Sequence, residues 1–320
     1  MYELADQKKV LFCTDLHGSE VYFGKVLASV LNLKVDVLLI SGDITGKSIV
    51  PIVKLGGDRY ITELFGRRME GQGEKGLQEL KDKIRYSGYY YYLATMDEIK
   101  ELQDKREKVD ELFTKVMCDT VAEWIQKIDR VLPKDVRVII NPGNDDRFDV
   151  DDVIKASDRV EYTLGKVDYL DDRHPMVACE WVNTTPFESP RECSEDELEK
   201  RLRKEIEKLG DYKNAVFDFH APPYNTRLDL APKLDKNLKP VTSFGQSVMI
   251  HVGSKAVLKV IKEYQPILGL HGHIHESAGV INIGRTWCVN PGSEYVEGIM
   301  HGYVVILKED KIEYFPVMGG

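Results

Sequence analysis

Residues 267–275 read Ile-Leu-Gly-Leu-His-Gly-His-Ile-His, a short apolar run that passes directly into three histidines at alternate positions. A run of about four to eight apolar residues bounded by polar residues is typical of a strand buried in a sheet. In open α/β sheets, ligands bind in the crevice beyond the carboxyl ends of the strands. The stretch therefore predicts that His273 and His275 lie at a ligand-binding edge of a sheet.

Four earlier apolar runs end in polar residues of the same kind. They are Val10–Thr14 before Asp15-Leu16-His17, Val35–Ser41 before Gly42-Asp43, Val136–Asn141 before Gly143-Asn144-Asp145, and Ala215–Phe219 before His220. Because the carboxyl ends of such strands meet at one edge of the sheet, we expect all five sets of side chains to converge there.

The remaining pattern indicates an α/β fold. Further apolar runs predict strands at Met176–Val182, Val280–Ile283, Thr286–Val289, Tyr303–Leu307 and Lys311–Phe315. Runs this rich in Val, Ile and Leu are typical of sheets that are covered on both faces. A capping box at residues 194–197 predicts a helix between two strands, ending near Leu209.

The physical interpretation of the converging side chains is a site for two divalent metal ions. Imidazole, carboxylate and amide ligands together suit borderline ions such as Mn, Fe, Zn, Ni or Co. Two ions about 4 Å apart can share a bridging water and lower its pKa, which generates hydroxide at neutral pH. Asp43 is the candidate for a carboxylate between the ions, and Gly42, Gly143 and Gly272 would let the backbone approach them closely.

The ordered set D-x-H, G-D, G-N-x-D, a lone His after a strand, and G-H-x-H resembles the calcineurin-like metallophosphoesterase superfamily, from Asp15 to His275. The stretch HGHIHES at 271–277, followed by NPGSEY at 290–295, is similar to the Icc-related branch of that superfamily. The resemblance implies a four-layer α/β/β/α sandwich with two mixed sheets. It also implies hydrolysis of a phosphoester or phosphoanhydride, in which a metal-bridging hydroxide attacks phosphorus in line.

The resemblance assigns two sets of metal ligands that share Asp43 as a bridge. The first ion would be held by Asp15, His17, Asp43 and His275, and the second by Asp43, Asn144, His220 and His273. His271 lies within the same motif at a position that the family does not use as a ligand, so we expect it to support a ligand or to pack.

One position departs from the family pattern. Many members carry a His after the Asn, which is assigned to leaving-group protonation or phosphate contact, whereas this chain has Asp145 there. A carboxylic acid beside two dications is a poor general acid near pH 7. Either the leaving group needs little help or another group donates the proton, and His251 is the candidate. The candidate catalytic residues are Asn144, Asp145 and His251.

Two arginines follow ligand-bearing loops and are candidates for substrate binding. Arg147 or Arg227 can hold a phosphate through two parallel hydrogen bonds. A solvated surface arginine is the equal alternative for each. The segment from His220 to Gly245 contains four prolines and is expected to be a long loop that forms a lid or substrate wall.

The spacing of the motifs predicts one catalytic domain, residues 1–320, with an insertion at 47–118. Asp15 and Asp43 are 28 residues apart, but Asp43 and Asn144 are 101 apart. The insertion is expected to be a cap of one hairpin plus helices. The hairpin is predicted at 51–65 and is followed by a loop at 70–76. A short helical segment with tyrosines at 86–92 comes next, and one long helix runs from a capping box at 95–98 to Pro133. We expect the tyrosines mainly to pack, with base stacking as the alternative. The insertion is also a candidate contact for a homodimer.

The composition limits the classes of binding partner and the cellular compartment that we expect. The chain has 44 Lys and Arg against 53 Asp and Glu, a net charge of −9, which makes nucleic acid and anionic membranes unlikely partners. An anionic substrate is still compatible, because bound metals reverse the local sign. No apolar window is long enough for a membrane span, and the amino-terminal residues do not resemble a signal peptide. Five scattered cysteines without C-x-x-C fit reduced thiols in the cytoplasm.

The sequence therefore predicts a cytoplasmic, dinuclear-metal phosphohydrolase, with Mn expected to support activity best. The expected substrate is a small phosphodiester or a nucleotide-type phosphate. A nuclease or a protein phosphatase on the same fold is one alternative, and a non-catalytic metal-binding scaffold for protein partners is another.

Overall fold

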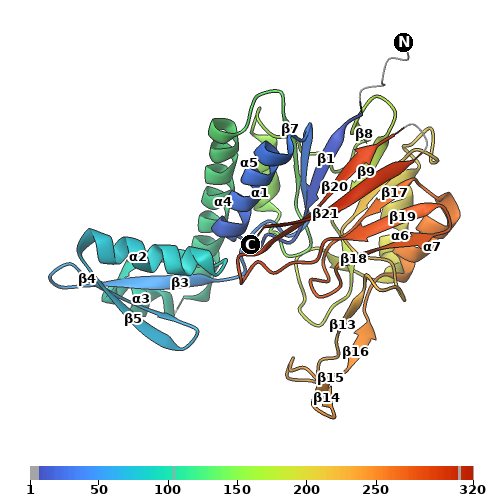
Figure 1. The fold of residues 1–320 in the computed structure, drawn as a ribbon. Coiled ribbons are helices and arrows are strands. Elements are labelled where there is room, and N and C mark those ends of the chain that lie inside the picture. The colour runs from blue at the N-terminus through green and yellow to red at the C-terminus, as the bar shows by residue number, and fades with distance from the viewer. Residues whose placement is uncertain (1–6, 104, 309–310, 320) are drawn as a thin grey trace.

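The computed structural model describes residues 7–103, 105–308 and 311–319, and its centre is a pair of mixed β-sheets (Figure 1). The strands of the first sheet run in the order β21-β20-β1-β2-β7. Their bounds are Lys9–Cys13 for β1, Val37–Ser41 for β2, Arg137–Asn141 for β7, Met300–Leu307 for β20 and Ile312–Gly319 for β21. The three strands β1, β2 and β7 are parallel, while β20 and β21 run antiparallel to their neighbours.

The second sheet has the order β18-β19-β17-β12-β9-β8. Its strands are β8 (Asp168–Tyr169), β9 (Pro175–Cys179), β12 (Val216–Phe219), β17 (Leu268–Leu270), β18 (Gly279–Ile283) and β19 (Thr286–Asn290). The four strands β9, β12, β17 and β19 are parallel. The ten strands predicted from apolar runs are therefore confirmed, with ends that differ by a few residues.

Alternating side chains along the strands build the layers. Val10 and Phe12 of β1 face the second sheet, whereas Leu11 and Cys13 face helices on the outside. The second sheet repeats the pattern, because Phe217 and Phe219 of β12 face a separate cluster that includes buried residues of two further helices. Each fully buried Val, Leu or Phe side chain stabilises the fold by about 1.5–3 kcal/mol. The result is the predicted four-layer α/β/β/α sandwich.

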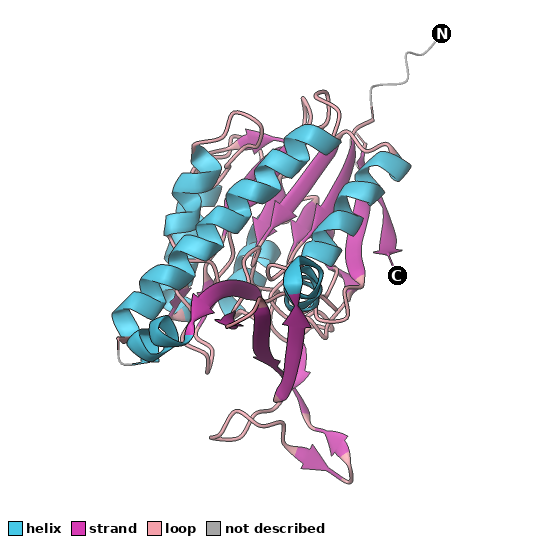
Figure 2. Cartoon of the chain, turned by 90° about the vertical axis from the view of Figure 1, so that its left-hand side faces the viewer, coloured by secondary structure: helices cyan, strands magenta, loops and turns pink. Residues whose placement is uncertain are grey.

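Helices cover the outer face of each sheet, and Figure 2 is viewed from the side of those that cover the first sheet. The first sheet is covered by α1 (Glu20–Leu33), α4 (Arg106–Val131) and α5 (Asp149–Lys155), and the second by α6 (Glu195–Ile206) and α7 (Lys255–Tyr264). The predicted capping box of α6 is present, since the Ser194 hydroxyl accepts a hydrogen bond from the Glu197 amide at 3.3 Å.

Residues 49–95 form a separate four-stranded sheet, which projects away from the sandwich (Figure 1). Its elements are β3 (Ile49–Leu55), β4 (Arg59–Leu64), β5 (Arg67–Gln72), α2 (Gly73–Tyr86) and β6 (Tyr90–Thr95). The predicted hairpin is confirmed as β3–β4. The predicted loop at 70–76 is wrong, because it contains the end of β5 and the start of α2. The helical segment predicted for the tyrosines is also wrong beyond Tyr86, since β6 pairs in parallel with β3.

The long predicted helix is divided in two. The capping box at Thr95 does begin a helix, because Thr95 and Glu98 exchange hydrogen bonds between side chain and backbone at 2.7 and 3.2 Å. That helix, α3 (Met96–Gln103), is followed by α4, whose buried face packs on the first sheet. The insertion end predicted at residue 118 falls within α4.

The segment after His220 is also more regular than predicted. β13 (Leu230–Pro232) pairs with β16 (Met249–His251), and β14 (Thr242–Ser243) pairs with β15 (Gln246–Ser247). The two hairpins form an arm that projects below the second sheet in Figure 1. A further short pair, β10 (Val182–Asn183) and β11 (Glu192–Cys193), lies near α6. None of the helices in the described residues combines the length and apolar character needed to cross a membrane.

Candidate metal centre

The loops that follow β1 and β2 are held together by backbone hydrogen bonds. The amide of Asp15 donates to the carbonyl of Gly42 at 2.9 Å, and the amide of His17 donates to the carbonyl of Asp43 at 3.0 Å. The loop after β17 joins them, because the amide of His273 donates to the Asp15 carboxylate at 3.0 Å. The predicted motifs therefore converge on one edge through local strand ends and direct contacts between their loops.

Four candidate ligands have an unusual backbone conformation. Asp15, His17, Asp43 and His273 have φ angles of 54°, 43°, 46° and 68°. Such left-handed conformations are uncommon for residues other than glycine and cost about 1–3 kcal/mol each. They occur at this edge because surrounding hydrogen bonds fix them. Concentrated strain of this kind is typical of functional sites.

Gly143 is required by close packing against Asp43. A Cβ atom at Gly143 would lie 2.2 Å from the Asp43 nitrogen and 2.3 Å from its Oδ1 atom. We therefore expect Gly143→Ala to displace Asp43, to lower the free energy of unfolding by about 1–3 kcal/mol, and to weaken metal binding. Urea denaturation and metal titration check both effects.

Gly24 provides the matched control for this prediction. It lies inside α1 with no atom within 4 Å of an added Cβ. Gly24→Ala is expected to stabilise the protein by about 0.5–1 kcal/mol through helix propensity and to leave metal binding unchanged. Equal metal affinity in both variants would contradict the role given to Gly143.

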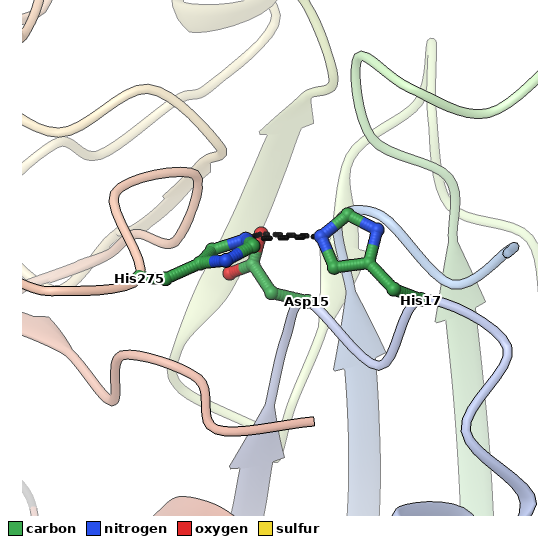
Figure 3. A group of neighbouring side chains, drawn as sticks. All are labelled: Asp15, His17 and His275. Carbon is green, nitrogen blue, oxygen red and sulfur yellow. Dashed lines mark hydrogen bonds and ion pairs between the residues drawn. The ribbon is translucent and has the colours of Figure 1, made fainter. Parts of the chain in front are cut away.

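The first ligand group consists of Asp15, His17 and His275, with ligand atoms that all lie within 4.8 Å of one another. Figure 3 shows the two imidazoles directed toward each other beside the carboxylate. The Nε2 atoms of His17 and His275 are 2.9 Å apart, and His275 Nε2 lies 3.4 Å from Asp15 Oδ1. Asp15 and His17 are fully buried. Nitrogen and oxygen donors converging on one point are the arrangement that a divalent ion requires.

The second ligand group consists of Asp43, His220 and His273, again with ligand atoms within 4.8 Å. His220 Nε2 lies 3.4 Å from Asp43 Oδ2, and the same Asp43 oxygen lies 3.9 Å from His17 Nε2 of the first group. Asp43 thus lies between the two groups, where the resemblance requires a bridging carboxylate.

The amide nitrogen of Asn144 is engaged, whereas its oxygen is left without a partner in the described part of the chain. Its Nδ2 atom donates to Ser189 Oγ at 2.8 Å and to Asp145 Oδ1 at 2.9 Å. Its Oδ1 atom is buried and has no hydrogen-bond partner among the described residues, and the same is true of both ring nitrogens of His220. Buried polar atoms without partners are costly. A bound divalent ion would satisfy Asn144 Oδ1 and one nitrogen of His220, so these residues fit the metal.

The electrostatics of the cluster favour a bound cation. Burial, followed by the charge of His220, lowers the pKa of His273 to about 3, so this imidazole is neutral and can act as a ligand. Burial opposes protonation of His220, but Asp43 and the other carboxylates outweigh it and raise its pKa to about 9. The carboxylates therefore hold a proton in the cluster. Metal binding to such a set of ligands displaces protons.

Two buried residues support the ligands without joining them. The Asp146 carboxylate accepts hydrogen bonds from the amides of Gly143 at 2.7 Å and Thr45 at 2.8 Å, so it joins the loops after β2 and β7. His271 Nδ1 bonds to the carbonyl of Phe219 at 2.7 Å, beside His220. Burial lowers the pKa of His271 to about 4. Its Nε2 atom is buried without a hydrogen-bond partner among the described residues, and its expected role beside the ligands stays a prediction.

Three other predicted site residues have partners of their own. His251 Nδ1 bonds to the buried Asp229 at 2.7 Å, at the base of the arm. Arg147 donates to Thr114 at 2.6 Å and pairs with Asp110, both on α4. Arg227 is exposed and lies beside Gly279. These contacts do not join the three side chains to the ligand groups, and their catalytic or substrate-binding roles stay predictions.

Sequence reasoning missed residues that other loops bring to the site. Lys47 forms an ion pair with Asp145 at 2.7 Å. The Tyr295 ring lies 4.6 Å from the His17 ring and 5.8 Å from the His275 ring. The Tyr295 position was marked only by the NPGSEY stretch. For Lys47 the available signal was its place four residues after Asp43.

Most of the chain matches the model of a known protein family. Residues 8–277 match the family model described as calcineurin-like phosphoesterase. The uncharacterized protein MJ1162 of Methanocaldococcus jannaschii is 31% identical over 184 residues, which is 55% of this chain and 75% of that protein.

One solved structure shows the same fold at low sequence identity. It aligns with a TM-score of 0.56 at 16% identity, covering 97% of this chain and 98% of its own. A dimetal phosphatase from Danio rerio aligns with a TM-score of 0.48 at 10% identity, covering 97% of this chain and 98% of its own. The family match spans the five motifs, from Asp15 to His275. The chain therefore belongs to the calcineurin-like phosphoesterase family.

Proposed function

We propose that this protein is a dinuclear-metal-dependent phosphohydrolase that cleaves a small phosphodiester or nucleotide-type substrate, with Mn²⁺ as the most effective ion. The observation that carries the proposal is the placement of Asp43 between two groups of buried ligands. Sites with two ions about 4 Å apart clamp both the attacking and the leaving oxygen of a displacement at phosphorus.

Each residue in the proposed site has a role that follows from its contacts. Asp15, His17 and His275 would hold one ion, His220, His273 and Asn144 the other, and Asp43 both. When bound, the two ions supply an activated water and positive charge for the phosphoryl group. Ser189 fixes the amide of Asn144, and the Asp145 amide fixes Asp43 by donating to its Oδ1 at 2.8 Å. The protein thereby sets the geometry before the substrate arrives.

Aromatic side chains beside the ligands support a substrate that carries a ring. Tyr295 contacts the rings of two candidate ligands, and a Cβ on Gly88 would lie 3.0 Å from the Tyr295 ring. The next residue, Tyr89, lies 5.5 Å from the ring of Phe65, which is 62% exposed. Aromatic faces of this kind stack on planar rings. A nucleobase or another aromatic group would then lie against the separate sheet while its phosphate is at the metals.

The net charge bears on the class of substrate, and the cysteines bear on the cellular compartment. A net charge of −9 disfavours polymeric nucleic acid as substrate. The five scattered cysteines without C-x-x-C suit a reducing compartment, and we place the protein in the cytoplasm.

A comparison of activated substrates tests the proposed function. We expect protein stripped of metal by a chelator to be inactive, because the ions supply the activated water and the positive charge for the phosphoryl group. Added Mn²⁺ is expected to restore turnover of bis(4-nitrophenyl) phosphate. Release of 4-nitrophenol is followed by absorbance. Plasmid DNA is expected to remain uncleaved under the same conditions.

Two results would contradict the proposal in different ways. Metal-loaded protein that turns over neither this diester nor 4-nitrophenyl phosphate would favour a binding scaffold. Cleavage of DNA with a steep dependence on salt would instead identify a nuclease.

A further inference from the structure

We propose that Lys47 is a catalytic residue that contacts the substrate phosphate, in place of the histidine that many family members carry at the position of Asp145. The inference rests on the proposed function and assigns a role that no predicted residue fills. Its basis is the ion pair between Lys47 and Asp145, directly beside Asp43.

The backbone before Lys47 is fixed at the junction between the sandwich and the separate sheet. The Gly46 amide donates to the hydroxyl of the buried Tyr90 at 2.7 Å. A Cβ at Gly46 would lie 2.7 Å from the carbonyl oxygen of Gly88, so the two backbone segments are in close contact there. The Gly18 amide, just beyond His17, donates to the Ile44 carbonyl at 2.9 Å. The backbone that leads to Lys47 is therefore packed against the loops that carry the candidate ligands.

Asp145 connects Lys47 to the ligand groups. Its carboxylate lies within 4.8 Å of ligand atoms of His17 and Asp43, and its amide donates to Asp43 Oδ1. Lys47 Nζ is 2.7 Å from Oδ2 of the same carboxylate. The ammonium group is therefore beside the candidate metal centre, and the Lys47 side chain is 44% exposed.

This placement suits contact with a phosphate. Asp145 alone would repel an anionic substrate, and the positive charge of Lys47 offsets that repulsion. An ammonium group has three donors, so a single contact with Asp145 leaves others for a phosphoryl oxygen that faces away from the metals. Preorganised donors of this kind stabilise the charge that develops in a displacement at phosphorus.

Two of the residues predicted to contact the substrate or to donate a proton are engaged elsewhere, and the third, Arg227, is exposed beside Gly279. Arg147 is bound to α4 through Thr114 and Asp110, and His251 is bound to Asp229. Lys47 is the cationic residue whose pair with Asp145 places it at the ligands.

The test compares Lys47→Met with the unaltered protein, both loaded with Mn²⁺. We expect kcat/KM for bis(4-nitrophenyl) phosphate to fall about 10²-fold, the usual cost of removing one preorganised donor. Affinity for inorganic phosphate, measured by calorimetry, is expected to fall about tenfold or more. Metal content, measured by mass spectrometry, is expected to stay the same.

Two further variants keep the test specific. Lys47→Arg retains the charge and is expected to retain most of the phosphate affinity. Lys54→Met removes an exposed lysine of β3 that pairs with Asp58. This variant should leave turnover, phosphate affinity and metal content unchanged. Unchanged phosphate affinity in Lys47→Met would overturn the inference, and so would a loss of metal in that variant.

The phosphate measurement separates this inference from the proposed function. If the protein turns over no phosphoester, the proposed function fails, but phosphate binding still decides the role of Lys47. A loss of activity confined to substrates with poor leaving groups would also overturn the phosphate contact, because it would identify a proton donor.

Discussion

Asp43→Asn is expected to reduce phosphoester turnover by at least about 10³-fold, since loss of a single preorganised contact already costs about 10²–10³. The Asp43 carboxylate lies 3.4 Å from His220 Nε2 and 3.9 Å from His17 Nε2, so both ligand groups lose an anionic oxygen together. Asparagine tolerates the left-handed φ of 46°. The backbone should therefore stay in place while the number of bound ions falls.

Asp58→Asn is a matched control. Asp58 also has a left-handed conformation, with a φ of 54°, but its side chain is 71% exposed in the turn between β3 and β4. The same chemical change there should leave metal content, turnover and melting temperature as they are. If Asp43→Asn retained two ions and most of its turnover, the bridging role of Asp43 would be wrong.

Arg191→Met is expected to lower the free energy of unfolding by about 3–5 kcal/mol, as is usual when one member of a buried ion pair is removed. Arg191 is fully buried, lies 2.6 Å from Asp151 and 3.5 Å from Glu180, and donates to the carbonyl of Asp146 at 3.0 Å. Methionine fills much of the volume but leaves the two carboxylates without their partner. Urea denaturation measures the change.

A second effect of Arg191→Met is expected at the metal centre. The Arg191 amide donates to the carbonyl of Asn144 at 3.2 Å, so a looser loop would weaken the second ligand group. Arg68→Met is the control, because Arg68 forms an exposed pair with Glu70 and such pairs contribute about 0–1 kcal/mol. Equal stability losses in the two variants would contradict the structural role of Arg191.

The sandwich and the ligand groups were predictable because each motif is local. An apolar run followed at once by Asp, His or Asn predicts both a buried strand and which end of that strand faces the ligand site. Parallel strands then bring these carboxyl ends together at one edge of the sheet. The alternation of Val10 and Phe12 with Leu11 and Cys13 even separates the two faces of β1. For these elements, packing and sequence pattern agree.

The separate sheet was harder to predict because its burial pattern is weak. No side chain of β5 is buried, so the strand has no apolar alternation, and α2 begins without a side-chain cap at its amino-terminal end. The arm after His220 has the same weakness, since β14 and β15 are exposed along their length. Only pairing with neighbouring strands identifies such segments.

Lys47, Ser189 and Arg191 were missed for a different reason. Lys47 follows Asp43 by four residues, but no motif marks that position. Ser189 and Arg191 come from a loop that reaches the site only through tertiary contacts. Polar residues in loops are usually solvated, so their roles follow from geometry alone.

The most direct test of the account is metal titration of chelator-stripped protein, with bound ions counted by mass spectrometry and turnover of bis(4-nitrophenyl) phosphate measured on the same samples. Two ions per chain are predicted, with activity that rises as the second site fills, because Asp43 lies between two groups of ligands. Saturation at a single ion, or two bound ions without hydrolysis of a phosphoester, would contradict the account.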